Sequence, residues 1–215
     1  MFAKAPVAGR VKTRLARRWG AEGARGAYTG LLRHTLAVAA ASGAAPLEIW
    51  GSPGRDHPWL RARARAFGAA LRVQPRGDLG ARMHRALADA LRRGPCAVVI
   101  GGDCAGLTPD LIRAAFARLA DGAEAVVVPA EDGGYVLMGV RRPLPGLFRG
   151  VPWGTGRVMA ATRRRARRLG VALAELPPAW DVDHPADLHR VRRTLRVPAW
   201  PRCGRRCGGD GHPVS

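Results

Sequence analysis

The chain contains almost no lysine and few aromatic residues. Only Lys4 and Lys12 are lysines among 36 basic residues, and aromatic side chains make up 6% of the sequence. Against 16 acidic residues this gives a formal net charge of +20. Such a balance can favour nucleic acid, an anionic membrane surface or anionic metabolites. Because the sequence has neither a known nucleic-acid-binding module nor aromatics interleaved with its basic residues, we interpret the charge as a compositional bias towards arginine and expect no nucleic-acid partner.

Long hydrophobic runs and metal-binding cysteine patterns are also missing. No apolar stretch approaches the ~18 residues of a membrane span, and the start lacks the apolar core of a signal peptide. We therefore expect a cytoplasmic protein. Cys203 and Cys207 form a C-x-x-x-C, but without a second ligand pair this indicates zinc only weakly. Cys104 has two interpretations, a reactive thiol or a small buried residue.

Helix and strand patterns alternate along the chain. Apolar runs predict strands over residues 96–101, 125–128, 135–140 and 171–173, and periodic segments predict helices over 13–42, 80–93, 155–169 and 185–195. This alternation is typical of an α/β domain with a largely parallel sheet covered on both faces. We expect one domain over residues 1–197 and an irregular basic tail over 198–215. The first strand is confined to residues 1–3, so it is either very short or cut by a late start assignment.

The carboxylate of Asp103 stands at the most informative position. It follows the apolar run Val98–Ile100 and then Gly101 and Gly102. Ligands of α/β sheets bind beyond the carboxyl ends of the strands. We therefore expect Asp103 to hold a metal or substrate, and the two glycines to leave room for a ligand. The alternative is a cap on the helix that begins near Pro109, although the separation is awkward for a cap.

Four cations lie in the loop that leads into the first helix: Lys4, Arg10, Lys12 and Arg14. A helix N-terminus attracts anions through its free N–H groups and its dipole. The loop thus suits a diphosphate, although its spacing is not that of a P-loop, and an exposed basic turn is the alternative. Further along, Asp78 can cap the next helix. Arg82 then falls in the first turn, where a nearby substrate anion would relieve the unfavourable dipole.

Two glycine-containing loops follow. Asp132 precedes Gly133, Gly134 and Tyr135, where glycines permit positive φ and a close substrate, and Asp132 can orient a hydroxyl or act as a base. An Asp-Gly hairpin turn is the simpler alternative. In the second loop, Trp153 suits the wall of a pocket. Thr155 suits either a cap on the basic helix or a substrate contact.

Near the C-terminus, Asp181 and Asp183 alternate in an extended segment, which places them on the same side. Magnesium takes one or two carboxylates together with waters and substrate phosphates. Asp103 and Asp183 are a suitable pair for such an ion.

These motifs together resemble a known family. The segments 4–15, 77–83, 100–107, 129–139, 153–155 and 181–188 are similar to bacterial glycosyltransferase-like proteins of the GT-A superfamily. Within that superfamily the chain is most similar to the arsenosugar-biosynthesis, or radical-SAM/selenodomain-associated, glycosyltransferases. It departs from their pattern at Ala8, where a proline is usual, and at Gly102 and Ala105, which replace a serine and a proline.

The resemblance implies a nucleotide-diphospho-sugar transferase fold, which is a Rossmann-like three-layer α/β/α sandwich. It also implies Mg²⁺ or Mn²⁺ on Asp103 and Asp183. The nucleotide phosphates would lie on the basic loop, with the donor sugar or acceptor at Asp132–Tyr135. The leading hypothesis is a metal-dependent glycosyltransferase that acts on a nucleotide sugar and a small-molecule acceptor, as in arsenosugar biosynthesis. Alternatives are a nucleotidyltransferase of guanylyltransferase type and, from another class, a basic nucleic-acid-binding protein.

Overall fold

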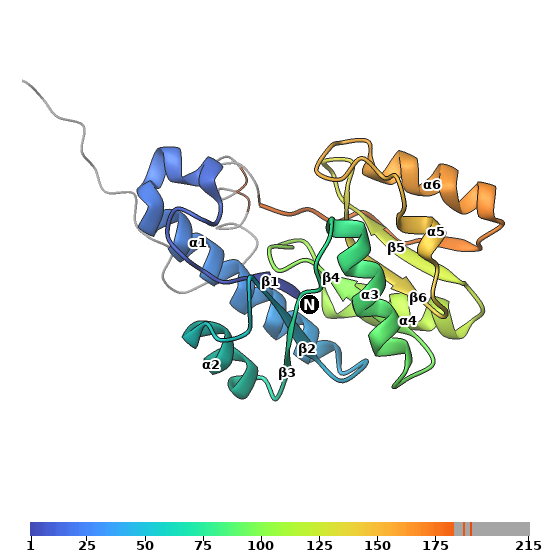
Figure 1. Cartoon of the computed structure of the whole chain (residues 1–215), viewed down its shortest axis with the longest axis horizontal. Coiled ribbons are helices and arrows are strands. Elements are labelled where there is room, and N and C mark those ends of the chain that lie inside the picture. Colours follow the sequence, from blue (N-terminus) through green and yellow to red (C-terminus); the bar gives the residue numbers. More distant parts are fainter. Residues whose placement is uncertain (183–186, 188–189, 191–215) are drawn as a thin grey trace, which may run out of the picture.

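The computed structural model describes residues 1–182, 187 and 190, and its strands form two sheets (Figure 1). The first sheet pairs β1 (Phe2–Lys4), β2 (Glu48–Ser52) and β3 (Ala70–Val73) in parallel, in the order β1-β2-β3. The second has the order β4-β6-β5-β7, from β4 (Ala97–Ile100), β5 (Ala125–Pro129), β6 (Tyr135–Val140) and β7 (Leu173–Glu175). The predicted α/β class with a Rossmann-like parallel sheet is confirmed.

One strand runs against the others. β6 is antiparallel to both β4 and β5, whereas β5 and β7 are parallel. The link between β5 and β6 spans only residues 130–134, which is too short for the crossover that parallel strands require. The Asp-Gly turn therefore closes a hairpin, the simpler of the two interpretations of that segment.

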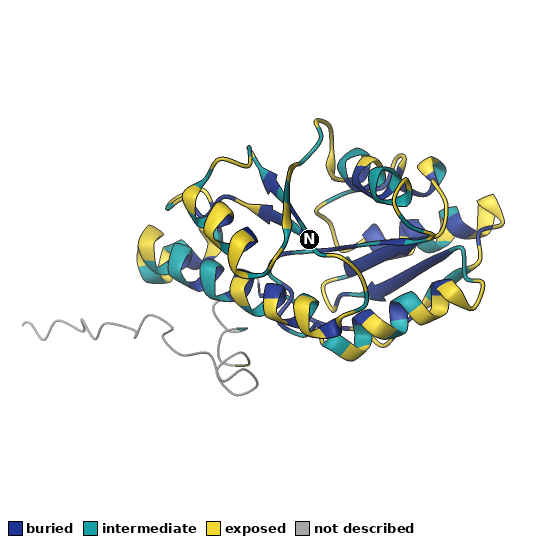
Figure 2. Cartoon of the chain, turned by 90° about the horizontal axis from the view of Figure 1, so that it is seen from below, coloured by how far each residue is buried: buried dark blue, intermediate teal, exposed yellow. Residues whose placement is uncertain are grey.

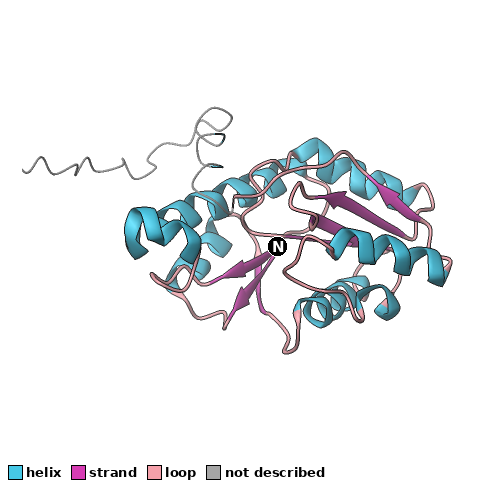
Figure 3. Ribbon diagram, turned by 90° about the horizontal axis from the view of Figure 1, so that it is seen from above, coloured by secondary structure: helices cyan, strands magenta, loops and turns pink. Residues whose placement is uncertain are grey.

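Helices cover both faces of the sheet (Figure 3). Residues of α1 (Thr13–Ser42), α2 (Pro58–Ala66) and α4 (Pro109–Ala120) belong to one hydrophobic cluster. Residues of α3 (Leu79–Leu91), α5 (Pro145–Phe148) and α6 (Val158–Leu169) belong to another. Along β5, Val126 and Val128 contribute to the first cluster, and Ala125 and Val127 to the second. All four are fully buried, as expected for a strand with helices on both sides (Figure 2).

Local signals set several helix ends. Thr108 caps α4 by accepting a hydrogen bond from the backbone N–H of Leu111 at 3.2 Å. A non-helical Gly20, with φ 69° and ψ 171°, interrupts α1. Gly170 ends α6 in the left-handed conformation that favours glycine.

Two short elements differ from the predicted pattern. α5 is a four-residue turn with no periodicity of its own. β7 begins at Leu173, whereas the strand was expected over 171–173. The expected last helix over 185–195, apart from residues 187 and 190, and the tail over 198–215 lie outside the described residues. None of the helices in the described part of the chain has the length and apolar character of a membrane span.

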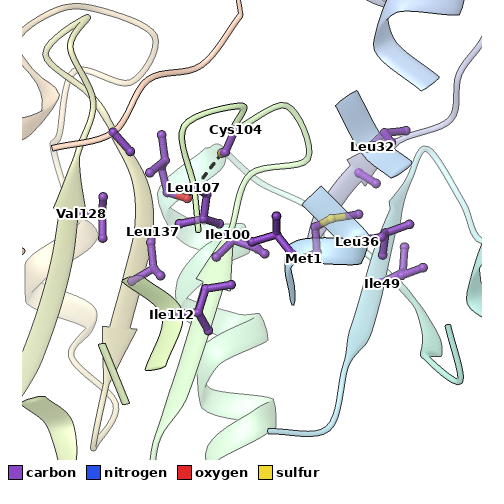
Figure 4. Packing of buried hydrophobic residues seen from close by; sticks show 14 of the residues in the cluster. Met1, Leu32, Leu36, Ile49, Ile100, Cys104, Leu107, Ile112, Val128 and Leu137 are labelled. Carbon is purple, nitrogen blue, oxygen red and sulfur yellow. Dashed lines mark hydrogen bonds between the residues drawn. The ribbon is translucent and has the colours of Figure 1, made fainter. Parts of the chain in front are cut away.

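The two sheets meet where β1 lies beside the end of β4. A Cβ on Gly102 would come within 2.9 Å of the carbonyl oxygen of Phe2 and 2.5 Å of Leu32 Cδ2. Glycine is therefore needed here by the packing of β1 and α1. Figure 4 shows Leu32, Leu36 and Ile100 in the same buried cluster, which extends from α1 to β4. The line where the sheets meet thus brings the loops after β1 and β4 together.

Gly139, in the middle of β6, provides a test of this packing. A Cβ there would lie 2.8 Å from Val126 Cγ1, 2.9 Å from Val98 Cγ2 and 3.0 Å from Leu119 Cδ1. Gly139→Val should overpack this face and lower the free energy of unfolding by about 1–3 kcal/mol. Urea denaturation followed by circular dichroism measures the loss. The control is Gly54→Val, at a site with nothing within 4 Å, and equal losses in both variants would contradict this account.

Candidate functional site

A cavity of about 980 Å³ opens at the carboxyl ends of β1 and β4. Most of the candidate residues line it, although they come from segments far apart in the sequence. Asp78, Gly133 and Asp183 are the exceptions, and Asp183 lies outside the described residues. The candidates that line the cavity are Lys4, Arg10, Lys12, Arg14, Arg82, Asp103, Asp132, Gly134, Tyr135, Trp153 and Thr155.

An ion pair joins the first loop to the loop after β4. Lys12 Nζ lies 2.6 Å from Asp103 Oδ2, and the two side chains are 7% and 32% exposed. Asp103 is therefore not a helix cap; Thr108 has that role. The nearly buried ammonium has exchanged much of its hydration for this contact, so removing the carboxylate alone would leave a poorly solvated charge.

The backbone of Lys12 is strained. It lies in the left-handed region, with φ 44° and ψ 48°, and is the one non-glycine residue with positive φ in the described part of the chain. Such a conformation costs an L-residue about 1–2 kcal/mol. The carbonyl of Lys12 accepts hydrogen bonds from the backbone N–H groups of Leu15 at 2.9 Å and Ala16 at 3.1 Å. Lys12 is thus the N-cap of α1, so the positive end of this helix dipole lies at the cavity.

Tyr28 is a cavity residue that sequence reasoning missed. Its hydroxyl accepts a hydrogen bond from the backbone N–H of Lys4 at 2.9 Å. Burial, and then the negative charge of Asp103, raise the pKa of this phenol well above its usual range. The hydroxyl therefore stays protonated. The chain has only two tyrosines, Tyr28 and Tyr135, and the structure places both at the cavity.

Cys104 is a structural residue. It is 2% exposed, and its Sγ lies 3.7 Å from the carbonyl oxygen of Val136 (Figure 4). Burial raises the pKa of its thiol well above the usual value, and the charges of Asp103 and Asp181 add to the effect. A thiol in this setting is not a nucleophile, so the interpretation as a small buried residue is supported.

The two glycine-containing loops contact each other. Gly133 has φ 86°, and a Cβ there would overlap the carbonyl oxygen of Gly156. The carbonyl of Gly133 also accepts a hydrogen bond from the backbone N–H of Met159 at 2.8 Å, which ties the hairpin to the start of α6. Asp132 Oδ1 accepts a hydrogen bond from the backbone N–H of Gly134 at 2.8 Å. This bond orients the Asp132 carboxylate at the edge of the cavity.

Aromatic side chains form the wall nearest α3. The rings of Tyr135 and Trp153 meet edge to face, with centroids 6.1 Å apart. A Cβ on Gly80 would lie 2.7 Å from Trp153 Nε1, so the indole packs directly on the first turn of α3. Arg82, two residues further along α3, donates from Nε to the carbonyl of Gly77 at 2.7 Å. That bond holds the guanidinium at this wall.

Two candidates have local structural roles. Asp78 is the N-cap of α3 and accepts a hydrogen bond from the backbone N–H of Ala81 at 2.7 Å. Its carboxylate is used there, and it does not line the cavity. Thr155 does not cap α6, because the N-cap is Arg157. Its hydroxyl instead donates to the carbonyl of Pro152 at 2.8 Å and stabilises the turn before α6.

The donor set of the cavity suits a hard cation. Asp103 and Asp181 both line it, and the described lining contains no histidine or cysteine. Carboxylate oxygens in the wall of a cavity suit Mg²⁺ or Mn²⁺, which complete their shells with water and phosphate. The described residues contain no cluster of three or more His, Cys, Asp or Glu that could hold an ion alone.

A solved structure from Desulfovibrio desulfuricans G20 is similar over most of the chain. That protein carries the provisional description nucleotide-diphospho-sugar transferase. It is 32% identical, with a TM-score of 0.80, and the match covers 91% of this chain and 85% of that one. This relationship supports the prediction of a transferase.

Two more distant structures share the fold alone. A nucleotidyl transferase from Methanothermobacter is 17% identical, with a TM-score of 0.51, over 76% of this chain and 79% of its own. A CMP:2-keto-3-deoxy-manno-octonic acid synthetase complexed with CTP is 14% identical, with a TM-score of 0.50, over 89% and 95%. No curated protein matches the chain.

A family model matches residues 35–155, from the middle of α1 to the loop before α6. That segment contains Asp103 and both glycine-containing loops. The superfamily resemblance read from the sequence is thus supported, although no comparison reaches the arsenosugar group. The chain belongs to the family described as uncharacterised proteins conserved in bacteria, DUF2064.

Proposed function

We propose that this protein is a metal-dependent glycosyltransferase that moves a sugar from a nucleotide diphosphate to a small-molecule acceptor. One observation carries the proposal: a single cavity gathers the Asp103 carboxylate, the basic loop of Lys4 to Arg14 and the hairpin loop with Asp132. A sugar nucleotide needs cations at its diphosphate and a polar group at its reacting carbon. The cavity provides both.

The basic loop is the proposed diphosphate site. Arg10 and Arg14 can bind phosphate oxygens through their forked guanidinium groups, while Lys12 acts as a point charge. The N-terminus of α1 adds a favourable dipole at the same place. Positive charge held there lowers the barrier because negative charge develops on the diphosphate as it leaves.

Asp103 is the proposed metal ligand. The second carboxylate expected from the sequence is Asp183. Among the described residues, Asp181 is another carboxylate in the same lining. A bound Mg²⁺ or Mn²⁺ would neutralise the charge on the departing diphosphate. Asp103 and Asp181 supply carboxylate oxygens in a described lining that contains no histidine or cysteine. The metal is a proposal for this chain and rests on that donor set.

Asp132 is the proposed base. Its hydrogen bond to the backbone of Gly134 fixes one carboxylate oxygen and leaves the other to accept a proton. In the reaction, the acceptor oxygen forms a bond to the sugar carbon, the bond from that carbon to the diphosphate breaks, and the acceptor proton passes to Asp132. Tyr135 and Trp153 border this region and offer surfaces on which a sugar ring can pack.

A nucleotidyltransferase is the second candidate. Its support is the fold shared with a nucleotidyl transferase and a cytidylyl-type synthetase, together with a cation-rich loop that would equally suit a triphosphate. In that reaction an acceptor phosphate attacks the α-phosphorus and inorganic diphosphate leaves. The cytoplasmic location and a place in arsenosugar biosynthesis both stay predictions from the sequence.

Substitution of the carboxylate at the end of β4 tests the metal site. Asp103→Asn should weaken Mn²⁺-dependent binding of UDP-, GDP- or ADP-sugars on the order of 100-fold, since an ion ligand is lost. Isothermal titration calorimetry with and without Mn²⁺ measures the change. The matched control is Asp110→Asn, an exposed carboxylate outside the cavity. Binding that is equal in all three proteins, or that ignores Mn²⁺, would contradict the proposal.

The released product separates the two candidate reactions. The protein is incubated with Mn²⁺, a small-molecule extract as acceptor source, and either sugar nucleotides or nucleoside triphosphates. We expect nucleoside diphosphate from a sugar nucleotide and no inorganic diphosphate from a triphosphate, because only the glycosyl bond breaks. Chromatography and a coupled diphosphate assay give the two readouts. Inorganic diphosphate as the main product would establish the nucleotidyltransferase instead.

A further inference from the structure

Lys12 occupies the position next to the carboxylate that a metal would need. Its Nζ is 2.6 Å from Asp103 Oδ2, and its side chain is only 7% exposed. A divalent ion on Asp103 and an ammonium on the same carboxylate would repel each other strongly at such a separation. An ion can therefore bind there well only if Lys12 moves away or gives up its contact.

The backbone around Lys12 holds the lysine in place. The residue is strained, with φ 44°, and its carbonyl is fixed by the first hydrogen bonds of α1 from Leu15 and Ala16. A glycine at this position would adopt the same backbone conformation without strain, and it would bury no charged group. Strained positions persist where the surrounding structure determines them, and they concentrate at functional sites. With this backbone conformation, the ammonium group of Lys12 lies against the carboxylate of Asp103.

We propose that Lys12 acts as an internal counter-ion that suppresses metal binding at Asp103 until a diphosphate draws its ammonium away. The inference rests on the proposed function, since it takes Asp103 as the metal ligand. A diphosphate bound at the N-terminus of α1 offers Lys12 a second anion, because Thr13 and Arg14 of the same turn line the cavity. Once Lys12 contacts phosphate, the carboxylate accepts an ion, and the metal and the nucleotide bind cooperatively.

This coupling has a consequence for substrate binding. Free metal would occupy the site poorly, so the ion would enter with the nucleotide. Each ligand then strengthens the other by the same factor, as linkage requires. The cavity would thereby bind the metal ion well only together with a diphosphate.

The experiment measures Mn²⁺ affinity in nucleotide-free protein and phosphate-free buffer, from the electron paramagnetic resonance signal of free Mn²⁺. Lys12→Met keeps the side-chain stem without its charge, and Lys12→Gly also relieves the backbone strain, so that variant should fold. Both should bind Mn²⁺ on the order of tenfold more tightly than the unmodified protein, since a nearby positive charge is gone. Lys12→Arg keeps the charge and should leave the affinity within about twofold.

Arg17→Gln is the matched control for net charge, because it removes an exposed cation of α1 that lies outside the cavity. It should bind Mn²⁺ like the unmodified protein. If Lys12→Met and Lys12→Gly gain no affinity, or if Arg17→Gln gains as much as they do, the role of Lys12 is overturned. The proposed function is then still judged by Asp103→Asn with a sugar nucleotide. If the gain survives in Lys12→Met combined with Asp103→Asn, the ion is held elsewhere, and both the Lys12 role and the metal site at Asp103 fall.

Discussion

The ion pair between Lys12 and Asp103 links two halves of the fold. Lys12 ends the loop that follows β1, and Asp103 lies near the start of the loop that follows β4, so the contact spans the line where the two sheets meet. Its partners are held by backbone geometry: one by the first turn of α1 and the other by the end of a buried strand. The pair therefore does not depend on long side chains finding each other in solvent, as exposed ion pairs do.

The line along which the two sheets meet also determines where the cavity lies. Gly102 allows β1 and α1 to approach β4 closely, and the hairpin of β5 and β6 places its glycine-containing loop on the other side of β4. Gly102 was expected to leave space for a ligand, but its immediate neighbours are Phe2 and Leu32. The structure thus uses this glycine for packing, and the clearance around Asp103 follows from the arrangement of the loops.

Sequence reasoning located residues of the cavity and a helix cap where the signal lies in the local order of residues. Asp103 could be identified because strand, glycines and carboxylate are adjacent, and Asp78 was recognised as a possible cap for the same reason. Tyr28 could not be identified from the sequence. It lies in the apolar stretch of a long helix, and only the fold brings it near Lys4 and Asp103. The reversal of β6 was equally hidden, since an apolar strand has the same pattern in either direction, and only the length of the connecting turn decides. Lys12 carried no sign of its left-handed backbone, which depends on how the loop enters α1.

The charge in the cavity is distributed differently from the charge of the whole chain. The chain has 16 acidic residues against 36 basic ones, yet among the described residues that line the cavity five are acidic and six are basic: Asp103, Glu131, Asp132, Asp181 and Asp187 against Lys4, Arg10, Lys12, Arg14, Arg82 and Arg190. A surface that attracts nucleic acid concentrates positive charge, whereas this cavity concentrates the scarce carboxylates. Carboxylates gathered in a partly desolvated space repel one another unless cations stand between them. Glu131 has Arg190, whose guanidinium lowers its pKa, and Asp103 has Lys12. The cavity thus offers groups of both signs, as the proposed pair of a metal ion and a diphosphate requires.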